Sequence, residues 1–173
     1  MKRPTWATIV GVLTIIFGLF GILGGAQEIA MPYVLDMQSE MLEAMKESQV
    51  KSSENDENMD PMAMADVMES MLNYPEWMRV WFPISGIISI VISAAYFLNG
   101  VFLLMVKPFA IRFFYLTVGL SVAWAVVSSA VMMIGGSAML LAQIPWQIGS
   151  VAIDTVLLVV VAVGNKEGYQ VEI

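Results

Sequence analysis

The sequence predicts an all-α integral membrane protein, a bundle of four transmembrane helices with a long outer loop that contains two short amphipathic helices. Two observations predict this fold. Of the 173 residues, 58% are hydrophobic and only 13% are charged, against roughly 45–50% and about 25% in soluble domains. The apolar residues also gather into four runs of roughly 20 residues or more, the length that a helix needs to cross hydrocarbon.

The four runs are continuously apolar, without the alternation of polar and apolar residues that is typical of a membrane β-barrel. They therefore predict helical spans, and the whole chain, residues 1–173, forms a single membrane domain. The predicted segments are the first span at about 6–26, the outer loop at 27–80, the second span at about 81–106, the third at about 109–134, the fourth at about 144–164 and a cytoplasmic tail at 165–173.

Lysine and arginine near the ends of the spans predict the orientation, because short loops rich in these residues stay in the cytoplasm. On this criterion one side of the membrane holds Lys2, Arg3, Lys107, Arg112 and Lys166. The short loop on the opposite side, residues 135–145, has no charged residue. We therefore predict a multi-pass protein of the cell membrane (the inner or plasma membrane), with both termini in the cytoplasm.

Small residues share one face of the first span over its full length. The members of this stripe are Ala7, Gly11, Thr14, Gly18, Gly21 and Gly25. Helices in lipid associate through such small residues, which let two backbones approach closely. The stripe predicts a packing face, and it favours a retained span over the alternative of a cleaved signal peptide, for which residues 24–26 offer a passable cleavage site.

The outer loop is too long for a simple connection, so it should have a structure or function of its own. The first predicted amphipathic helix has an apolar face of Val34, Met37, Met41 and Met45 beside an acidic stripe of Asp36, Glu40, Glu43 and Glu47. The second has Asp60 as its N-cap, Pro61 at its first position, and an apolar face of Met64, Val67, Met68, Met71 and Leu72. Residues 46–58 are predicted to be a polar linker.

Most of the 15 methionines lie in this loop. Thioether sulfur binds soft metals such as Cu(I), and Met59, Met62 and Met64 have the close spacing of such a site. The alternative is that methionine, a flexible apolar side chain, fills helix faces that pack on one another or on a partner. No histidine or cysteine completes a ligand set, so no cofactor is predicted.

The chain has no histidine or cysteine, and its net charge is −7. Both features exclude classes of function. Nucleophile pairs that use Cys or His, thiolate metal sites and disulfides are excluded. The acidic residues gather in the outer loop, which makes nucleic acid an unfavourable partner. No acid and base converge at a recognisable spacing, so we predict that the protein is not an enzyme.

Asp154 is the one charged residue near the middle of a predicted span. An aspartate at that depth costs roughly 2.5–3.5 kcal/mol on insertion scales, so it should face the bundle interior and have polar partners. At matching depth lie Ser89, Ser93, Ser121 and Ser128, with Tyr96 and Asn99 somewhat nearer the cytoplasm. Two interpretations remain open: a polar residue that joins helices, or part of a proton or cation pathway.

Three functional hypotheses follow. The first is a non-enzymatic interaction or accessory subunit that docks a partner through the outer loop, either a membrane protein or a second copy of the chain. The second is an oligomeric channel or transporter subunit with Asp154 in its pathway. The third is a copper-handling protein that uses the methionines.

Overall fold

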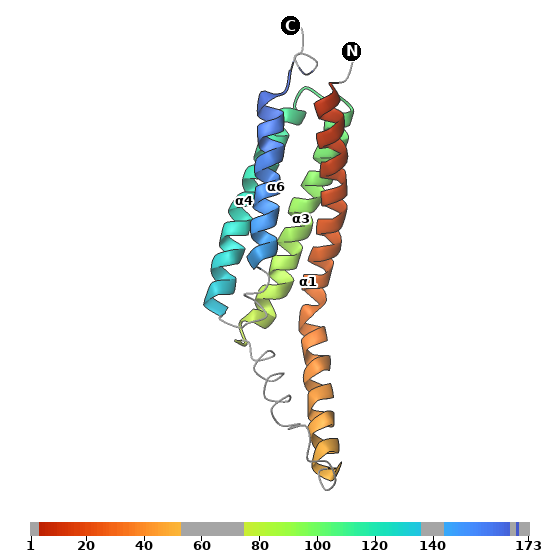
Figure 1. The fold of residues 1–173 in the computed structure, drawn as a ribbon, viewed down its shortest axis with the longest axis vertical. Helices are drawn as coiled ribbons and strands as arrows, with labels where there is room; N and C mark the ends of the chain where they lie inside the picture. Colours follow the sequence, from red (N-terminus) through yellow and green to blue (C-terminus); the bar gives the residue numbers. More distant parts are fainter. Residues whose placement is uncertain (1–3, 53–74, 136–143, 167–168, 170–173) are drawn as a thin grey trace.

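The computed structural model of the chain describes residues 4–52, 75–135, 144–166 and 169. Within these residues the regular elements are four helices, and they lie side by side in Figure 1 with both chain ends at the same end of the bundle. Their bounds are Thr5–Ser52 for α1, Met78–Leu104 for α3, Ala110–Gly135 for α4 and Ile144–Val163 for α6. The prediction of an all-helical fold is confirmed for this part of the chain.

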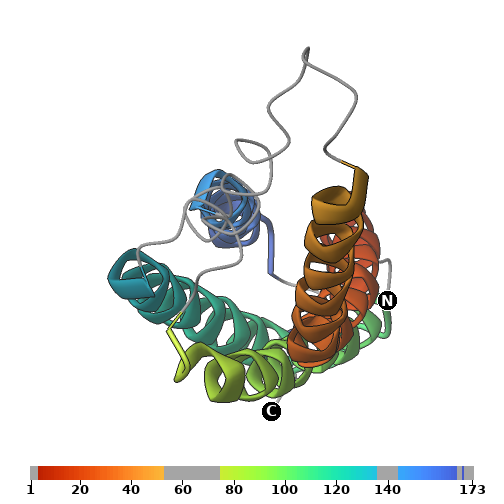
Figure 2. The ribbon, with the colours of Figure 1, turned by 90° about the horizontal axis from the view of Figure 1, so that it is seen from below.

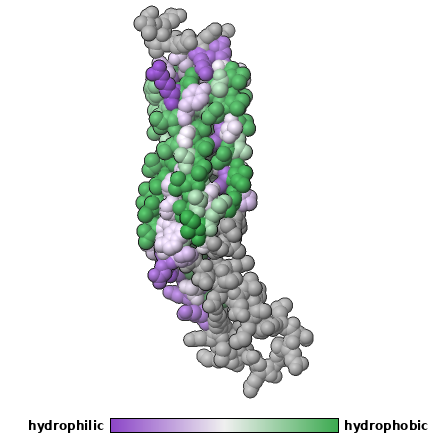
Figure 3. Space-filling view, turned by 90° about the vertical axis from the view of Figure 1, so that its left-hand side faces the viewer, coloured by the Kyte–Doolittle hydropathy of each residue, from purple (hydrophilic) through white to green (hydrophobic). Residues whose placement is uncertain are grey.

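Three of the helices, α1, α3 and α4, are long and apolar enough to cross a membrane, and α6 contains a shorter apolar helix, Gln147–Val163. Large apolar side chains such as Phe20, Leu23 and Leu116 point outward from the bundle. Figure 3 shows hydrophobic residues over most of the visible face, with hydrophilic residues gathered toward the two ends. An apolar exterior of this kind is consistent with a helical membrane protein.

The helix that contains the first predicted span does not end at residue 26, because α1 continues without interruption to Ser52. The stretch after residue 26 contains no glycine and is rich in Glu, Met and Gln, which favour helix. Pro32 lies inside the helix and does not end it. The first predicted amphipathic helix is therefore part of α1, and the second, in residues 53–74, lies outside the described residues.

The last part of α1, residues 33–52, is called the stalk below, and the two ends of the bundle are called the stalk end and the termini end. Figure 1 shows the stalk projecting past the ends of the other helices. At the stalk end, Leu35 packs with Met78, Phe82 and Met132 in a small apolar cluster. Arg79 also forms an exposed ion pair with Asp36, with 2.8 Å between Nη2 and Oδ1.

The small-residue stripe of α1 lies against α3. A Cβ added at Gly18 would lie 2.7 Å from the backbone nitrogen of Phe97, and one at Gly25 would lie 2.7 Å from the carbonyl oxygen of Gly86. The contact is reciprocal, since a Cβ at Gly86 would lie 2.5 Å from the Gly25 oxygen. The other stripe members follow the same seam: Ala7 and Thr14 are fully buried, and Gly11 and Gly21 face Gly100 and Ser93. Backbone therefore meets backbone along most of this interface.

The remaining helices complete the bundle in the order that Figure 2 shows, with α3 between α1 and α4, and α6 beside α4. At the termini end, the Trp6 indole donates a hydrogen bond to the carbonyl oxygen of Asn165 (2.9 Å), and the Tyr169 hydroxyl donates one to that of Leu103 (2.7 Å). The rings of Trp6 and Tyr169 are also in contact. The tail residues that follow α6 thus close the bundle at this end.

Candidate functional site

Asp154 lies inside the bundle and joins three helices. Its side chain, on α6, is only 7% exposed. The hydroxyl of Tyr96 on α3 donates a hydrogen bond to Oδ1 (2.6 Å), and the hydroxyl of Ser121 on α4 donates one to Oδ2 (2.9 Å). Each carboxylate oxygen therefore has a donor from a different helix, which is how a buried carboxylate is stabilised without a cation.

The helix faces explain why these three side chains meet. Asp154 shares its face of α6 with Leu157 and Val161, both buried, so this face points into the bundle. Tyr96 was predicted to lie nearer the cytoplasm than Asp154. Side chains on a helix lean toward its N-terminus, and α3 begins at the stalk end, so the phenol of Tyr96 reaches back to the depth of Asp154.

Of the predicted polar residues, the structure brings Ser121 and Tyr96 into contact with Asp154. The hydroxyl of Ser89 instead donates to Glu28 (3.4 Å), and Ser93 lies at Gly21 in the α1–α3 seam. Ser128 is buried on α4 two helical turns from Ser121. The grouping of polar residues by depth alone could not separate these cases, because it did not include the direction in which each side chain points.

Asn99 is fully buried on α3, one turn beyond Tyr96 toward the termini end. Neither its Oδ1 nor its Nδ2 has a hydrogen-bond partner among the described residues. An amide buried in this way costs roughly 1–3 kcal/mol. It is thus a buried polar group whose hydrogen bonds are unsatisfied among the described residues.

Glu28 is a second acidic residue within the bundle, and it was not among the site residues predicted from the sequence. Its Oε2 accepts hydrogen bonds from the hydroxyls of Ser85 (2.9 Å) and Ser89 (3.4 Å) on α3. A signal for it existed, since the alternating spacing of 4 and 3 in the small-residue stripe continues from Gly25 to Glu28 and then to Pro32 and Leu35. Ending the first span at residue 26 hid that continuation.

Together these residues form a polar column along α3. Its members are Ser85, Ser89, Ser93, Tyr96 and Asn99, at spacings of 4, 4, 3 and 3, with Glu28 and Asp154 bonded to it from α1 and α6. From Ser85 to Asn99 it extends for about 21 Å at about 1.5 Å per residue. Hydroxyl, amide and carboxyl groups can bind a proton or a water, and they can hold helices together.

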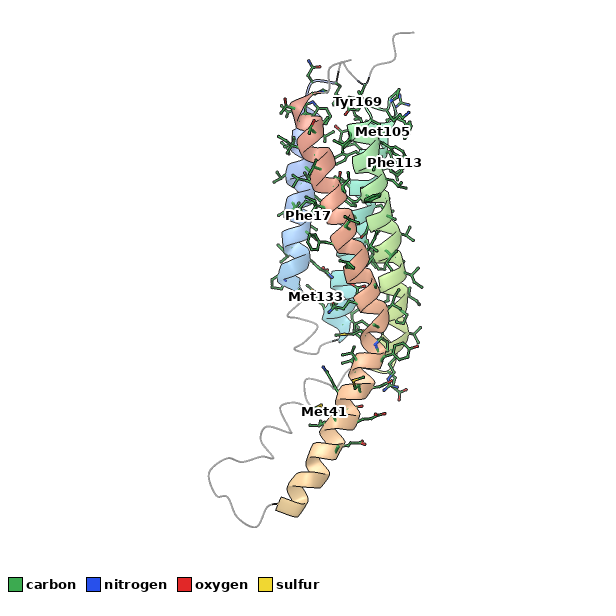
Figure 4. The ribbon with its side chains drawn as sticks, turned by 90° about the vertical axis from the view of Figure 1, so that its right-hand side faces the viewer. Phe17, Met41, Met105, Phe113, Met133 and Tyr169 are labelled. Carbon is green, nitrogen blue, oxygen red and sulfur yellow. The ribbon has the colours of Figure 1, made fainter. Side chains whose placement is uncertain are left out.

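The predicted methionine site for Cu(I) falls outside the part of the chain that the structure describes. Met59, Met62 and Met64 lie in residues 53–74, outside that part, and no group of three or more acidic side chains is placed to hold a metal within it. On the stalk, Met37 and Met41 are 71% and 66% exposed. Figure 4 shows Met41 beyond the ends of the other helices.

The fold and the buried polar groups define a class: a helical bundle with three helices long and apolar enough to cross a membrane and with polar residues turned inward. Comparison with protein families, with curated proteins and with solved structures finds no match.

Proposed function

We propose that the chain is a non-enzymatic multi-pass membrane protein with four spans that docks a partner through the stalk. On this proposal the protein lies in the cell (inner) membrane with both termini in the cytoplasm, and the stalk projects on the opposite side. The length and packing of α6 support the fourth span, and the exposed apolar face of the stalk supports docking.

The proportions and packing of α6 support a fourth span. Its 20 residues extend for roughly 30 Å at about 1.5 Å each, which matches the thickness of bilayer hydrocarbon. The helix lies alongside α4 (Figure 1) and exposes apolar side chains such as Ile148 and Val156, while it turns Asp154 inward. Because four spans return the chain to its starting side, they also agree with the distribution of lysine and arginine.

The observation that carries the docking proposal is the exposed apolar face of the stalk. Tyr33, Val34, Met37 and Met41 are exposed on one side of α1, whereas Leu35 and Leu42, on the other side, are buried. Contiguous exposed apolar side chains outside the bilayer are typical of a binding surface. Methionine suits such a surface because its flexible thioether adapts to the shape of a partner.

The charge beside this face indicates the chemistry of the partner. Asp36, Glu40 and Glu43 follow one edge of the apolar face at helical spacing. A complementary partner would present an apolar groove or helix face with lysine or arginine along one rim. The same surface could take a second copy of this chain only if that copy supplied basic residues.

The test is site-specific photocrosslinking in intact membranes. A benzophenone side chain at Met37 or Met41 is expected to give an intermolecular adduct, and the crosslinked peptide, read by mass spectrometry, should be apolar with flanking basic residues. The control is the same probe at Ser39, which is exposed at the same height but lies outside the apolar face.

Reversing the charge of the acidic residues beside the apolar face tests the proposed basic rim of the partner. Glu40→Lys together with Glu43→Lys should abolish the adduct at Met41, whereas Ser39→Lys should leave it. Equal adducts from Met41 and Ser39, or adducts with lipid alone, would contradict docking through this face. An adduct with the chain itself would make the partner a second copy.

A further inference from the structure

We infer that Asp154 is a proton-binding site loaded from the stalk end of the bundle, through the hydroxyl groups of the polar column that lead from Glu28 to Tyr96. This inference is independent of the docking proposal. It rests on the order of polar groups along α3 and on the difference between the two ends of that column.

The polar column has one member in each successive turn of α3 from Ser85 to Asn99. Ser89, which bonds Glu28, is followed one turn later by Ser93, and Tyr96 comes one turn after that and bonds Asp154. Ser93 is buried at the α1–α3 seam, where Gly21 leaves room for its hydroxyl. Side chains at spacings of 3 and 4 are neighbours on one helix face, so the hydroxyl-bearing residues Ser89, Ser93 and Tyr96 follow one another between the two carboxyl groups.

The column differs at its two ends. At the stalk end it finishes at Glu28, which is only half-buried. The cluster of Leu35, Met78 and Phe82 lies beside this end but leaves Glu28 partly exposed.

At the termini end the column finishes at Asn99, which is fully buried and has no partner among the described residues. Beyond Asn99 lie Leu103, Phe114 and Val161, all fully buried, and the Tyr169 hydroxyl is bonded to the carbonyl of Leu103. Thr14 and Thr117 are also buried toward this end, but their hydroxyls donate to the carbonyl oxygens of Val10 and Phe113 on their own helices. No serine or tyrosine continues the column along α3 beyond Asn99.

Few side chains near Asp154 can bind or release a proton, so the proposed proton-binding site can be assigned to this residue. Asp154 is faced by Tyr96 from α3 and by the neutral Ser121 from α4. Residues 4–27 of α1 contain no titratable side chain. Within the bundle, Glu28 and Asp154 are thus the two carboxyl groups of the column, with no lysine or arginine to hold either as an anion.

The proposed step conserves protons. A proton from water binds the Glu28 carboxylate, each hydroxyl in turn passes on its own proton and receives that of its neighbour, and the Asp154 carboxylate becomes a carboxylic acid. The serine and tyrosine hydroxyls end as they began. Release of the proton from Asp154 follows the same steps in reverse. Asp154 therefore exchanges protons with the stalk side alone, and no pore across the membrane is needed.

The test is infrared difference spectroscopy on proteoliposomes that hold the full chain in one orientation. After an acid jump on the stalk side, the carbonyl band of a protonated carboxylic acid should rise, and Asp154→Asn should lose that band. The same jump on the termini side should give a much slower rise. Ser89→Ala with Ser93→Ala should slow the stalk-side response by roughly tenfold, equivalent to about 1.4 kcal/mol in the barrier.

Two substitutions outside the proposed proton route serve as controls. Ser150→Ala removes an exposed serine hydroxyl that bonds only within α6, to the carbonyl of Gln147, and should not change the rate. Asn99→Leu should also leave the stalk-side rate unchanged. A faster response to the termini side, no Asp154 band at any pH, or an unaltered rate in a double serine variant that unfolds like the wild type would each overturn the inference.

Discussion

At the scale of single residues, the bundle contains two polar arrangements of opposite kind. Asp154 has a hydroxyl donor for each oxygen, from Tyr96 and Ser121, whereas both polar atoms of Asn99 are buried without a partner among the described residues. A satisfied buried carboxylate stabilises the contact of its helices, and an unsatisfied amide costs free energy. The two residues, close together in depth, should therefore respond to substitution with opposite signs.

The hydrogen bond between Tyr96 and Asp154 should be measurable as a coupling energy. We expect Tyr96→Phe to lower the free energy of unfolding by about 1–2 kcal/mol, because it leaves Oδ1 of a buried carboxyl without its donor. In the Asp154→Asn background the same substitution should cost less. Unfolding in mixed micelles, followed by circular dichroism, gives the double-mutant cycle, and strict additivity would contradict the bond.

Asn99→Leu should stabilise the protein. Leucine has the same branching as asparagine and removes two unsatisfied polar atoms, so the free energy of unfolding should rise by about 1–3 kcal/mol. The same micelle unfolding experiment measures it. Asn99→Ala, which also removes the amide but leaves a void, is the control for packing, and a loss of stability in the leucine variant would show that the amide has a partner.

At the scale of helices, α1 and α3 form the closest pair because glycine lies opposite glycine along their seam. Gly24 and Gly25 offer a matched comparison, since a Cβ at Gly25 would lie 2.7 Å from the Gly86 oxygen and one at Gly24 would meet nothing within 4 Å. Neighbouring residues of the same type thus differ only in the face of the helix that they occupy.

We expect Gly25→Ala to destabilise the bundle by about 1–3 kcal/mol, because backbone atoms must shift to admit the methyl group. Gly24→Ala should be neutral or stabilising by up to about 1 kcal/mol, since alanine is the better helix former. Unfolding midpoints of both variants, measured side by side, test this. Equal effects at the two positions would place the seam on another face of α1.

The sequence predicted the helix faces better than the helix ends. Its small-residue stripe, from Ala7 to Gly25, lies along α3 as a packing face, because periodicity records which side of a helix is buried. The continuation of the first helix past residue 26 was not predicted, because hydropathy falls at Gln27 while helix propensity does not, and the residues that pack on α3 show that the helix continues. Asn99 and Tyr96 could be placed in depth but not in direction, since partners across helices depend on tertiary geometry.

At the scale of the whole molecule, the map of sides can be tested with single cysteines, because the chain has none of its own. Met41→Cys on the stalk should react with a membrane-impermeant maleimide in intact cells, since that side chain is exposed. Lys166→Cys, just after α6, should react only after permeabilisation. Labelling is read by a gel shift, and reaction of both positions from the same side would refute the four-span topology.

The unbroken course of α1 has a mechanical consequence. Its 48 residues make a rod of about 72 Å at about 1.5 Å per residue, which passes from the stalk, along the glycine seam, to Trp6 at the opposite surface. A load applied to the tip is therefore delivered to the far surface as a tilt or an axial shift of one stiff lever, with Pro32 as its most compliant point. Because the Trp6 indole holds the Asn165 carbonyl, that motion would pull directly on the segment that follows α6.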